Sequence, residues 1–137
     1  MKTHRLLTTV AALFLATSVA RPLAQAQDVS LGDIKRIDLL RNDLSAPGRE
    51  VIQALIEFGP GVSAARHSHP GEEIAHVTEG LLEYQLDGRP PVTLKAGESI
   101  FIPSGTPHSA RNVGPGKAVE LATYFVEKGK PLLVLSK

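Results

Sequence analysis

The segment that decides the fold runs from residue 61 to residue 112 and holds four of the chain's five histidines. It opens with Gly61-Val-Ser-Ala-Ala-Arg-His67-Ser-His69-Pro-Gly-Glu-Glu73 and closes with Pro103-Ser-Gly105-Thr-Pro-His108-Ser-Ala-Arg-Asn112. His67 and His69 are two residues apart, and side chains at this spacing on an extended segment project to the same side. His108 lies about forty residues further along. We therefore expect His67, His69, Glu73 and His108 to meet in a small β-structure.

The chain around this segment reads as short strands separated by glycine and proline turns. Residues 50–58 alternate cleanly, with Ile52, Ala54, Ile56 and Phe58 on one face, and residues 81–86 place Leu82, Tyr84 and Leu86 together. Further strands are predicted at 73–79, 91–95, 99–102, 108–113, 117–126 and 131–135, with a weak edge strand at 34–40. Seven to nine strands with turn signals every 8 to 12 residues, and no convincing helix, predict an all-β antiparallel sandwich or barrel.

Three imidazoles and a carboxylate make a set of metal ligands. Such a set suits Fe, Mn, Ni, Cu, Co or Zn, and it does not suit Mg or Ca. Four protein ligands on a metal that prefers six positions leave room for water or a substrate, which is typical of catalytic sites. The sequence therefore predicts one divalent transition metal, whose identity the ligands leave open.

Two motifs in this segment resemble those of the cupin superfamily. The first is Gly61-x5-His67-x-His69-x3-Glu73-x6-Gly80, and the second is Gly97-x5-Pro103-x-Gly105-x2-His108-x3-Asn112. Sixteen residues separate them, as in small single-domain bacterial cupins of the type-2 kind. The resemblance implies a conical antiparallel β-barrel (a double-stranded β-helix related to the jelly roll), with His67, His69, Glu73 and His108 as ligands near one mouth. It also implies a homodimer, but it does not imply one activity.

Several neighbouring residues have two interpretations. The motif spacing favours Glu73 as the ligand, with Glu72 in solvent. If the strand alternates regularly from an inward Glu73, His76 points outward to the surface or to a subunit interface. Asn112 either donates a hydrogen bond behind the ligands or packs in the barrel. The aromatic residues Phe58, Tyr84 and Phe101 either line the cavity or belong to the ordinary core.

The first 26 residues predict a secretory signal peptide. Lys2 and Arg5 precede an uncharged, mostly apolar run over 6–20, and Ala24-Gln25-Ala26 offers a cleavage site after Ala26. A membrane anchor is the alternative, but 15 residues are fewer than the roughly 20 that span a bilayer. We therefore expect a periplasmic or secreted protein, not membrane-bound after cleavage, with one domain over 27–137 and its core over 48–128.

Composition restricts the partners. Cleavage would remove Lys2, Arg5 and Arg21 and no acidic residue, which changes the formal net charge from +1 to −2. The sequence has no basic segment with interleaved aromatic residues, which is the pattern typical of nucleic-acid binding, so we expect no nucleic-acid partner. The chain has no cysteine, so disulfides cannot stabilise the exported domain.

Two classes of function fit these observations. The first is a metal-dependent enzyme on a small organic substrate, either dioxygenase-like with a redox-active metal or an isomerase or lyase with zinc. No separate general base is visible in the sequence. The second is a non-catalytic module that binds a metal or a small ligand, since the short chain has no insertion that would enclose a substrate. A germin-like protein that dismutes superoxide is a weaker third reading, which the family resemblance allows.

Overall fold

The computed structural model describes residues 34–136. The predicted signal peptide and its cleavage site lie outside the described residues. Within this range every regular element is a strand, and no helix is long and apolar enough to cross a membrane. The strands are β1 (Ile34–Asp43), β2 (Arg49–Phe58), β3 (His67–Ser68), β4 (Gly71–Glu79), β5 (Leu81–Leu86), β6 (Val92–Lys95), β7 (Ser99–Ile102), β8 (His108–Asn112), β9 (Ala118–Glu127) and β10 (Val134–Leu135).

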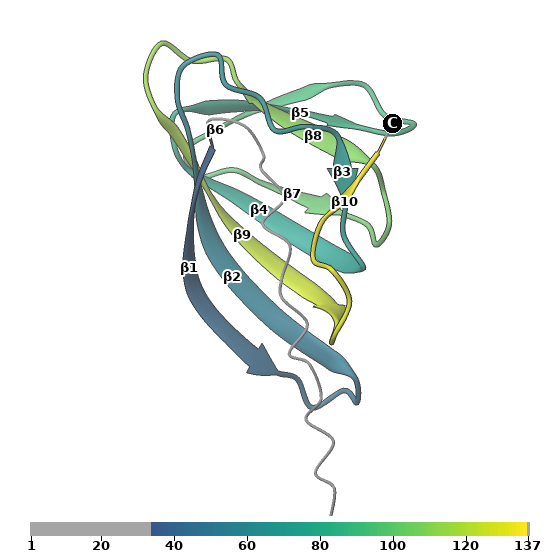
Figure 1. Cartoon of the computed structure of the whole chain (residues 1–137). Coiled ribbons are helices and arrows are strands. Elements are labelled where there is room, and N and C mark those ends of the chain that lie inside the picture. Colours follow the sequence, from purple (N-terminus) through teal and green to yellow (C-terminus); the bar gives the residue numbers. More distant parts are fainter. Residues whose placement is uncertain (1–33, 137) are drawn as a thin grey trace, which may run out of the picture.

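The strands form two five-stranded antiparallel sheets that face each other (Figure 1). The first sheet has the order β1-β2-β9-β4-β7, and the second has the order β10-β3-β8-β5-β6. This confirms the all-β, jelly-roll prediction. The closed barrel does not appear in the described residues, because the strands form two separate hydrogen-bonded sheets rather than one continuous one.

Period-two alternation fills the space between the sheets. The inward residues of β2 (Ile52, Ala54, Ile56, Phe58) and of β5 (Leu82, Tyr84, Leu86) are all buried, as predicted. Fully burying an aliphatic or aromatic side chain of this size stabilises a fold by roughly 1.5–3 kcal/mol. The core is therefore made mainly from these two alternating strands and from β9, which lies between β2 and β4.

The outer and shortest strands were the least predictable. The weak edge strand is present as β1 and continues to Asp43 on the edge beside β2. Residues 34–136 form ten strands rather than seven to nine, because the two-residue strand β3 was not predicted. Two residues are too few to show alternation, so only the pairing of β3 with β8 and β10 reveals it. The strand predicted at 131–135 is present as β10, which is shorter.

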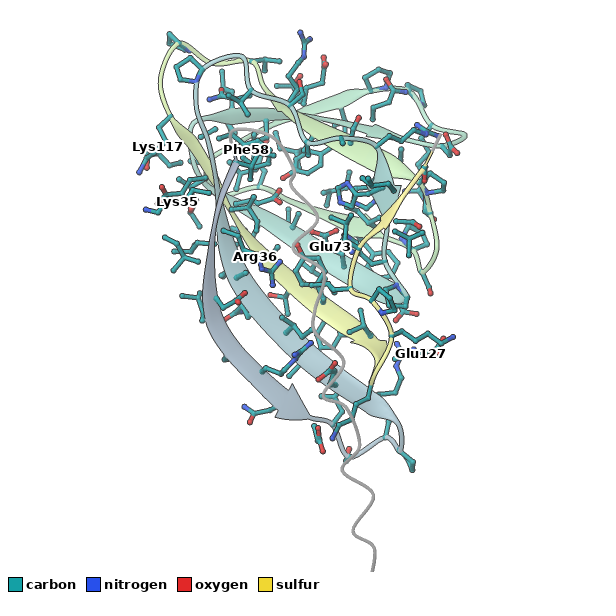
Figure 2. All side chains as sticks on the ribbon, viewed as in Figure 1. Lys35, Arg36, Phe58, Glu73, Lys117 and Glu127 are labelled. Atoms are coloured by element: carbon teal, nitrogen blue, oxygen red, sulfur yellow. The ribbon has the colours of Figure 1, made fainter. Side chains whose placement is uncertain are left out.

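The first sheet has a row of small residues across its inner face. Residues that face one another on neighbouring strands lie on the same side of a sheet. The inward rows are Ile52–Tyr124–Glu73, then Ala54–Ala122–Ala75, then Ile56–Glu120–Val77. The row of three alanines lies between the row with Tyr124 and Glu73 and the row with Glu120, and these three polar residues line the same cavity. Figure 2 shows Glu73 and Phe58 pointing into the space between the sheets.

The four motif glycines take the turn conformations that we predicted, with φ of 73° at Gly61, 77° at Gly80, 93° at Gly97 and 70° at Gly105. Other residues resist this left-handed region. At Gly105 the turn has a structural role, because its N–H donates to the carbonyl of His69 at 3.0 Å. The loop of the second motif is thereby joined to the histidine pair of the first.

Candidate metal centre

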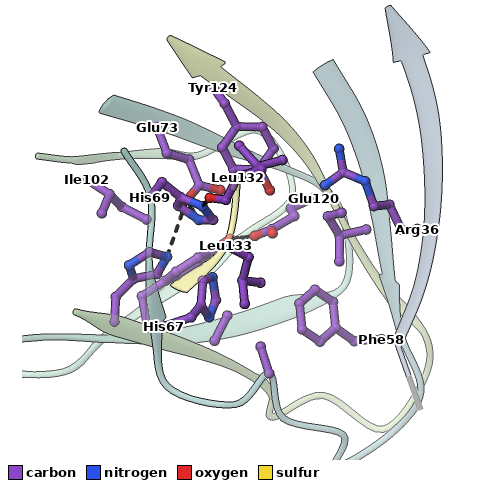
Figure 3. A pocket seen from close by; sticks show the side chains of 15 residues that line it. Arg36, Phe58, His67, His69, Glu73, Ile102, Glu120, Tyr124, Leu132 and Leu133 are labelled. Carbon is purple, nitrogen blue, oxygen red and sulfur yellow. Dashed lines mark hydrogen bonds and ion pairs between the residues drawn. The ribbon is translucent and has the colours of Figure 1, made fainter. Parts of the chain in front are cut away.

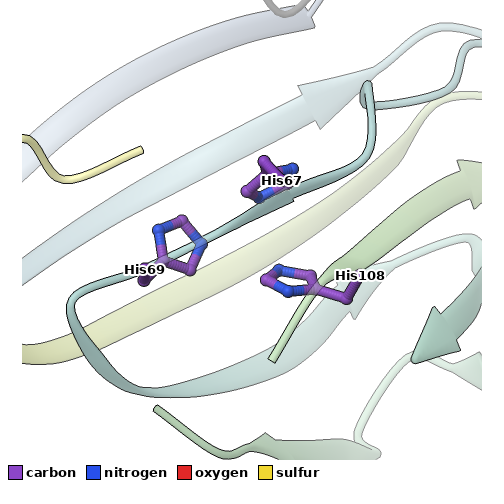
Figure 4. A group of neighbouring side chains, drawn as sticks. All are labelled: His67, His69 and His108. Atoms are coloured by element: carbon purple, nitrogen blue, oxygen red, sulfur yellow. The ribbon is translucent and has the colours of Figure 1, made fainter. Parts of the chain in front are cut away.

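Three histidines converge between the sheets (Figure 4). His67 on β3 and His108 on β8 are register partners, and His69 follows two residues after His67. Their ring centroids lie 4.4 Å (His67–His108), 4.8 Å (His67–His69) and 5.2 Å (His69–His108) apart. All three side chains are buried, and one nitrogen of each lies within 4.8 Å of the others, which is a geometry that could hold a metal ion.

Main-chain carbonyls orient the three rings. Each histidine has Nδ1 within hydrogen-bond distance of a carbonyl oxygen: His67 with Ala65 at 2.6 Å, His69 with Leu132 at 2.6 Å and His108 with Thr106 at 2.9 Å. A carbonyl can only accept, so Nδ1 carries the proton and Nε2 keeps its lone pair. Ligand histidines in metalloproteins are held in this way, with the second nitrogen free for the metal.

Glu73 on β4 brings a carboxylate to the same place from the other sheet. Its Oε2 lies 3.1 Å from Nε2 of His69 and 3.3 Å from Nε2 of His108. Within residues 34–136, Glu73 Oε2 and His69 Nε2 are the buried side-chain atoms without a hydrogen-bond partner. Two lone pairs that face each other in a dry interior are unfavourable unless a cation or proton lies between them. The residues present therefore fit a metal ion.

The pKa values agree with a site prepared for a cation. Burial lowers the pKa of His67 to about 4, so this imidazole is neutral and able to ligate near neutral pH. Burial alone would raise the pKa of Glu73, but hydrogen bonds from Nε2 of His108 and His69, which require a proton on Nε2 in the metal-free chain, hold its pKa below the usual value. A metal cation in the place of such a proton would favour the carboxylate in the same way. Glu73 is therefore ionised beside neutral His67.

The cavity at this centre has a volume of about 40 Å³, which is room for roughly three water-sized groups. Figure 3 shows its lining, in which apolar residues such as Phe58, Ile102 and Leu132 surround the polar ones. Three polar lining residues were missed in the sequence: Arg36 on β1 and Glu120 and Tyr124 on β9. The alternation of β9 shows that Glu120 and Tyr124 point inward with Ala122, but it does not show which residues of other strands they meet.

Glu120 is a buried carboxyl group on the floor of this cavity. The hydroxyl of Tyr84 donates a hydrogen bond to its Oε2. Burial first, and then the charge of Glu73, raise the pKa of Glu120 to about 8, although the Tyr84 hydrogen bond opposes the shift. Burial and the neighbouring Glu120 also raise the pKa of Tyr84. The sequence showed no separate general base, and Glu120 is a buried carboxyl group of the cavity lining that the sequence analysis did not consider for this role.

Tyr124 lies between the metal centre and Arg36. Its ring centroid is 4.7 Å from that of His69, and the guanidinium carbon of Arg36 is 5.6 Å from the centroid on the other side. Burial raises the pKa of Tyr124 well above its ordinary value, so the phenol keeps its proton. The ring is therefore a neutral wall with a hydroxyl group that can donate a hydrogen bond.

The structure distinguishes the interpretations that the sequence left open. Glu72 lies on the other face of β4, where Nη2 of Arg49 pairs with it at 2.6 Å. Ala75 and Val77 are fully buried, and the partly exposed His76 points outward with Nδ1 2.8 Å from Oγ of Ser99. The predicted orientations of Glu73, Glu72 and His76 are confirmed, and the role of Glu73 as a metal ligand stays a prediction.

The structure also shows which of the other four predicted residues, Phe58, Tyr84, Phe101 and Asn112, line the cavity. Phe58 and Tyr84 line the cavity, but Phe101 does not, because it lies on the outer face of β7 and is 53% exposed. Asn112 is buried away from the histidines. Its Nδ2 lies 3.1 Å from the carbonyl oxygen of Phe58 and 2.7 Å from that of Gly116. It joins loops to strand ends and does not stand behind a ligand.

The chain is similar to known proteins in sequence and in fold. By sequence, the chain is 30% identical over 87 residues to the dimethylsulfoniopropionate lyase DddW of Ruegeria pomeroyi, which covers 64% of this chain and 56% of that protein. By structure, it is similar to the dimethylsulfoniopropionate lyase DddQ of Ruegeria pomeroyi, with TM-score 0.57 and 28% identity over 63% of this chain and 43% of that chain.

A solved oxalate oxidase gives TM-score 0.56 and 30% identity over 62% of this chain and 45% of that chain. The chain thus spans little more than half, or less, of each of these proteins. The family model described as "Cupin domain" matches residues 54–127, which include both histidine motifs and all three converging histidines. The chain therefore belongs to the cupin domain family.

Proposed function

We propose that this chain is a metal-dependent enzyme that acts on a small organic molecule. Its ligands are His67, His69, His108 and Glu73, which hold one divalent transition metal among Fe, Mn, Ni, Cu, Co and Zn. The observation that supports this most strongly is the pair of buried, unpartnered atoms, Nε2 of His69 and Oε2 of Glu73, that face each other at 3.1 Å. A purely structural cluster would have no reason to keep both atoms unsatisfied.

The residues of the chain prepare this site in three ways. The carbonyl partners of the three Nδ1 atoms fix the rings, so binding requires little reorganisation. The apolar walls exclude bulk water and strengthen electrostatic interactions with the substrate. A divalent metal bound there would supply Lewis-acid polarisation of a substrate oxygen or, if it is redox-active, electron transfer.

Elimination is the leading reaction. Both the sequence relative DddW and the structural relative DddQ are named dimethylsulfoniopropionate lyases. A lyase of this kind removes a proton from one carbon while a bond to a leaving group on the next carbon breaks, so it needs a proton acceptor. Glu120 suits this role, because burial raises the pKa of its carboxyl to about 8, which makes its carboxylate a stronger base, and because Tyr84 holds it in one orientation.

Oxidation is the second candidate. The chain is 30% identical to an oxalate oxidase over the superposed region, and a redox-active metal in the same ligand set would permit dioxygen-dependent chemistry. Elemental analysis of the bound metal is the first way to distinguish these two reactions. Bound zinc would support elimination, because zinc has no redox chemistry.

The test uses the purified protein and two matched variants. Metal per chain is measured by elemental analysis, and the protein is then incubated with dimethylsulfoniopropionate, followed by NMR for the alkene product, and with oxalate under oxygen. His67→Ala should lose both metal and turnover. His76→Ala should keep both, because it removes a histidine from the same segment that points away from the centre.

Three outcomes would each reject one part of the proposal. If the purified protein contains no metal and takes up none on titration, the four residues are not metal ligands. If the metal-free variant His67→Ala still turns over substrate, the mechanism does not depend on a metal. Metal at one per chain with no turnover on a broad panel, together with tight binding of a small ligand, favours the non-catalytic module instead.

We also propose export and dimerisation, as the sequence led us to expect. Amino-terminal sequencing of the protein from the cell envelope should start at Gln27 if cleavage follows Ala26. Light scattering on the purified protein should give twice the mass of the mature chain. A start at Met1, or a monomeric mass, would reject the corresponding expectation.

A further inference from the structure

We infer that Arg36 forms an anion subsite beside the metal centre and that it binds the carboxylate of a small organic acid. This inference deepens the proposed function and depends on it, because the subsite serves the same cavity. It assigns a class of substrate to the enzyme, and it rests on the position of Arg36, on its one ion pair and on the charges around it.

The register of β1 turns Arg36 toward the cavity. Arg36 is the partner of Ile56 on β2, whose side chain is 3% exposed in the core, so the two share the inner face. The next residue back, Lys35, leaves the strand on the opposite side (Figure 2) and pairs with Glu57 at 3.4 Å. The side chain of Arg36 is 32% exposed, so it enters the cavity from the rim. Its ion pair with the exposed Asp38 offsets the cost of this partial burial.

The ion pair of Arg36 uses only one nitrogen of its guanidinium group. Nε of Arg36 donates to Oδ1 of Asp38 at 2.7 Å, and among residues 34–136 this is the carboxylate with which it pairs. The pairing through Nε leaves the edge formed by the two terminal nitrogens, which also lies within hydrogen-bonding reach of the hydroxyl of Tyr124. The two oxygens of a carboxylate match this edge and would accept from it together with, or in place of, that hydroxyl. Figure 3 shows Arg36 reaching from β1 toward Glu120 and Tyr124.

The charges in the cavity favour an anion. Apart from the histidines, its charged lining residues are Arg36, Glu73 and Glu120. Asp38, which pairs with Arg36, is 74% exposed and is not a lining residue. With a divalent metal bound, the positive charges of the metal and of Arg36 balance Glu73, Asp38 and an ionised Glu120, and they exceed these carboxylates when Glu120 is neutral. The lining residues taken without Asp38 are positive in both cases and solvent screens the exposed Asp38, so a small anion would be attracted to the loaded site.

The spacing limits the size of the acid. A single aromatic ring, that of Tyr124, separates the guanidinium of Arg36 from the imidazole of His69, with distances of 5.6 Å and 4.7 Å to its centroid. A molecule that reaches both ends has only a few carbon atoms between its carboxylate and its reacting centre. The apolar wall of Ile56 and Phe58 lies beside that path. The geometry thus points to a short-chain carboxylate rather than to a long or polyanionic one.

The test is direct binding to the zinc-loaded chain, which needs no turnover. Calorimetry compares propionate with propionamide, which has the same shape and no charge. Wild type should bind propionate about tenfold or more tightly than propionamide, as expected for charge-assisted hydrogen bonds. Arg36→Gln should remove that preference, and Arg36→Lys should keep only part of it, because an ammonium group lacks the planar fork. Lys35→Gln, the same loss of charge on the outer side of β1, should leave the preference unchanged.

Zinc per chain is measured in each sample, so that failure of the anion subsite can be distinguished from failure of the metal centre. Full zinc with an undiminished propionate preference in Arg36→Gln overturns the subsite and leaves the metal centre standing, since propionate would then bind the metal alone. Full zinc with no propionate preference in wild type also overturns the subsite. Failure of wild type to bind zinc overturns the proposed function and the subsite with it.

Discussion

Replacing Glu120 by glutamine should change how the stability of the metal-free protein depends on pH. The pKa of this carboxyl is raised from the usual 4.5 to about 8 by burial and by the charge of Glu73. Between those values the folded state keeps a proton that the unfolded state has released. The free energy of unfolding of the wild type therefore falls as the pH rises through this range. The amide introduced by Glu120→Gln cannot ionise, so the variant lacks this loss.

The magnitude follows from the shift. A proton bound only in the folded state changes the free energy of unfolding by about 1.4 kcal/mol per pH unit, so from pH 5 to pH 8 the upper limit is about 4 kcal/mol. Near pH 5 the wild type and Glu120→Gln should be similar, because the amide oxygen can still accept from the hydroxyl of Tyr84. Near pH 8 the variant should be the more stable protein.

Urea unfolding of chelator-treated protein at several pH values measures this difference. Glu79→Gln is the control, because it removes an exposed carboxylate that pairs with Lys117 at 3.2 Å. A constant difference between wild type and Glu120→Gln from pH 5 to pH 8 would refute the reasoning. Saturation with zinc should reduce the pH dependence, because the metal offsets the charge of Glu73 that helps to raise the pKa of Glu120.

Two other substitutions test structural roles. Asn112→Ala should lower the free energy of unfolding by about 3 kcal/mol, because buried carbonyls such as that of Phe58 lose their donor. It should leave the metal content unchanged, and loss of metal would show that Asn112 supports the ligands. Gly71→Ala should cost about 1–3 kcal/mol, because the added Cβ overlaps the Phe125 carbonyl oxygen and lies 2.7 Å from Cα of Val126. Gly116→Ala, whose Cβ meets nothing within 4 Å, is its control in urea unfolding, and equal costs would contradict this account.

The sequence was sufficient for features that depend on local spacing. Period-two alternation placed Ile52 through Phe58 and Leu82 through Leu86 on the buried face. It also distinguished Glu73 from Glu72 and turned His76 outward. These predictions succeed because a strand fixes the side of each residue independently of the rest of the fold.

Features that depend on register between distant strands could not be predicted. Glu120 shares the cavity with Tyr84 only because two different sheets bring β9 and β5 face to face. Arg36 reaches the cavity only through the pairing of an edge strand whose own alternation is poor. Phe101 was misplaced because Ser99-Ile-Phe-Ile102 is apolar on both sides, and the pattern of such a run does not say which face is buried.

The candidate metal ligands come from both sheets, so metal binding would be coupled to the stability of the fold. His67 and His108 belong to the second sheet, whereas Glu73 and Glu120 belong to the first. A cation held between the imidazoles and Glu73 would therefore be a link between the two sheets. Because these ligands meet only in the folded chain, metal affinity would add directly to the free energy of unfolding.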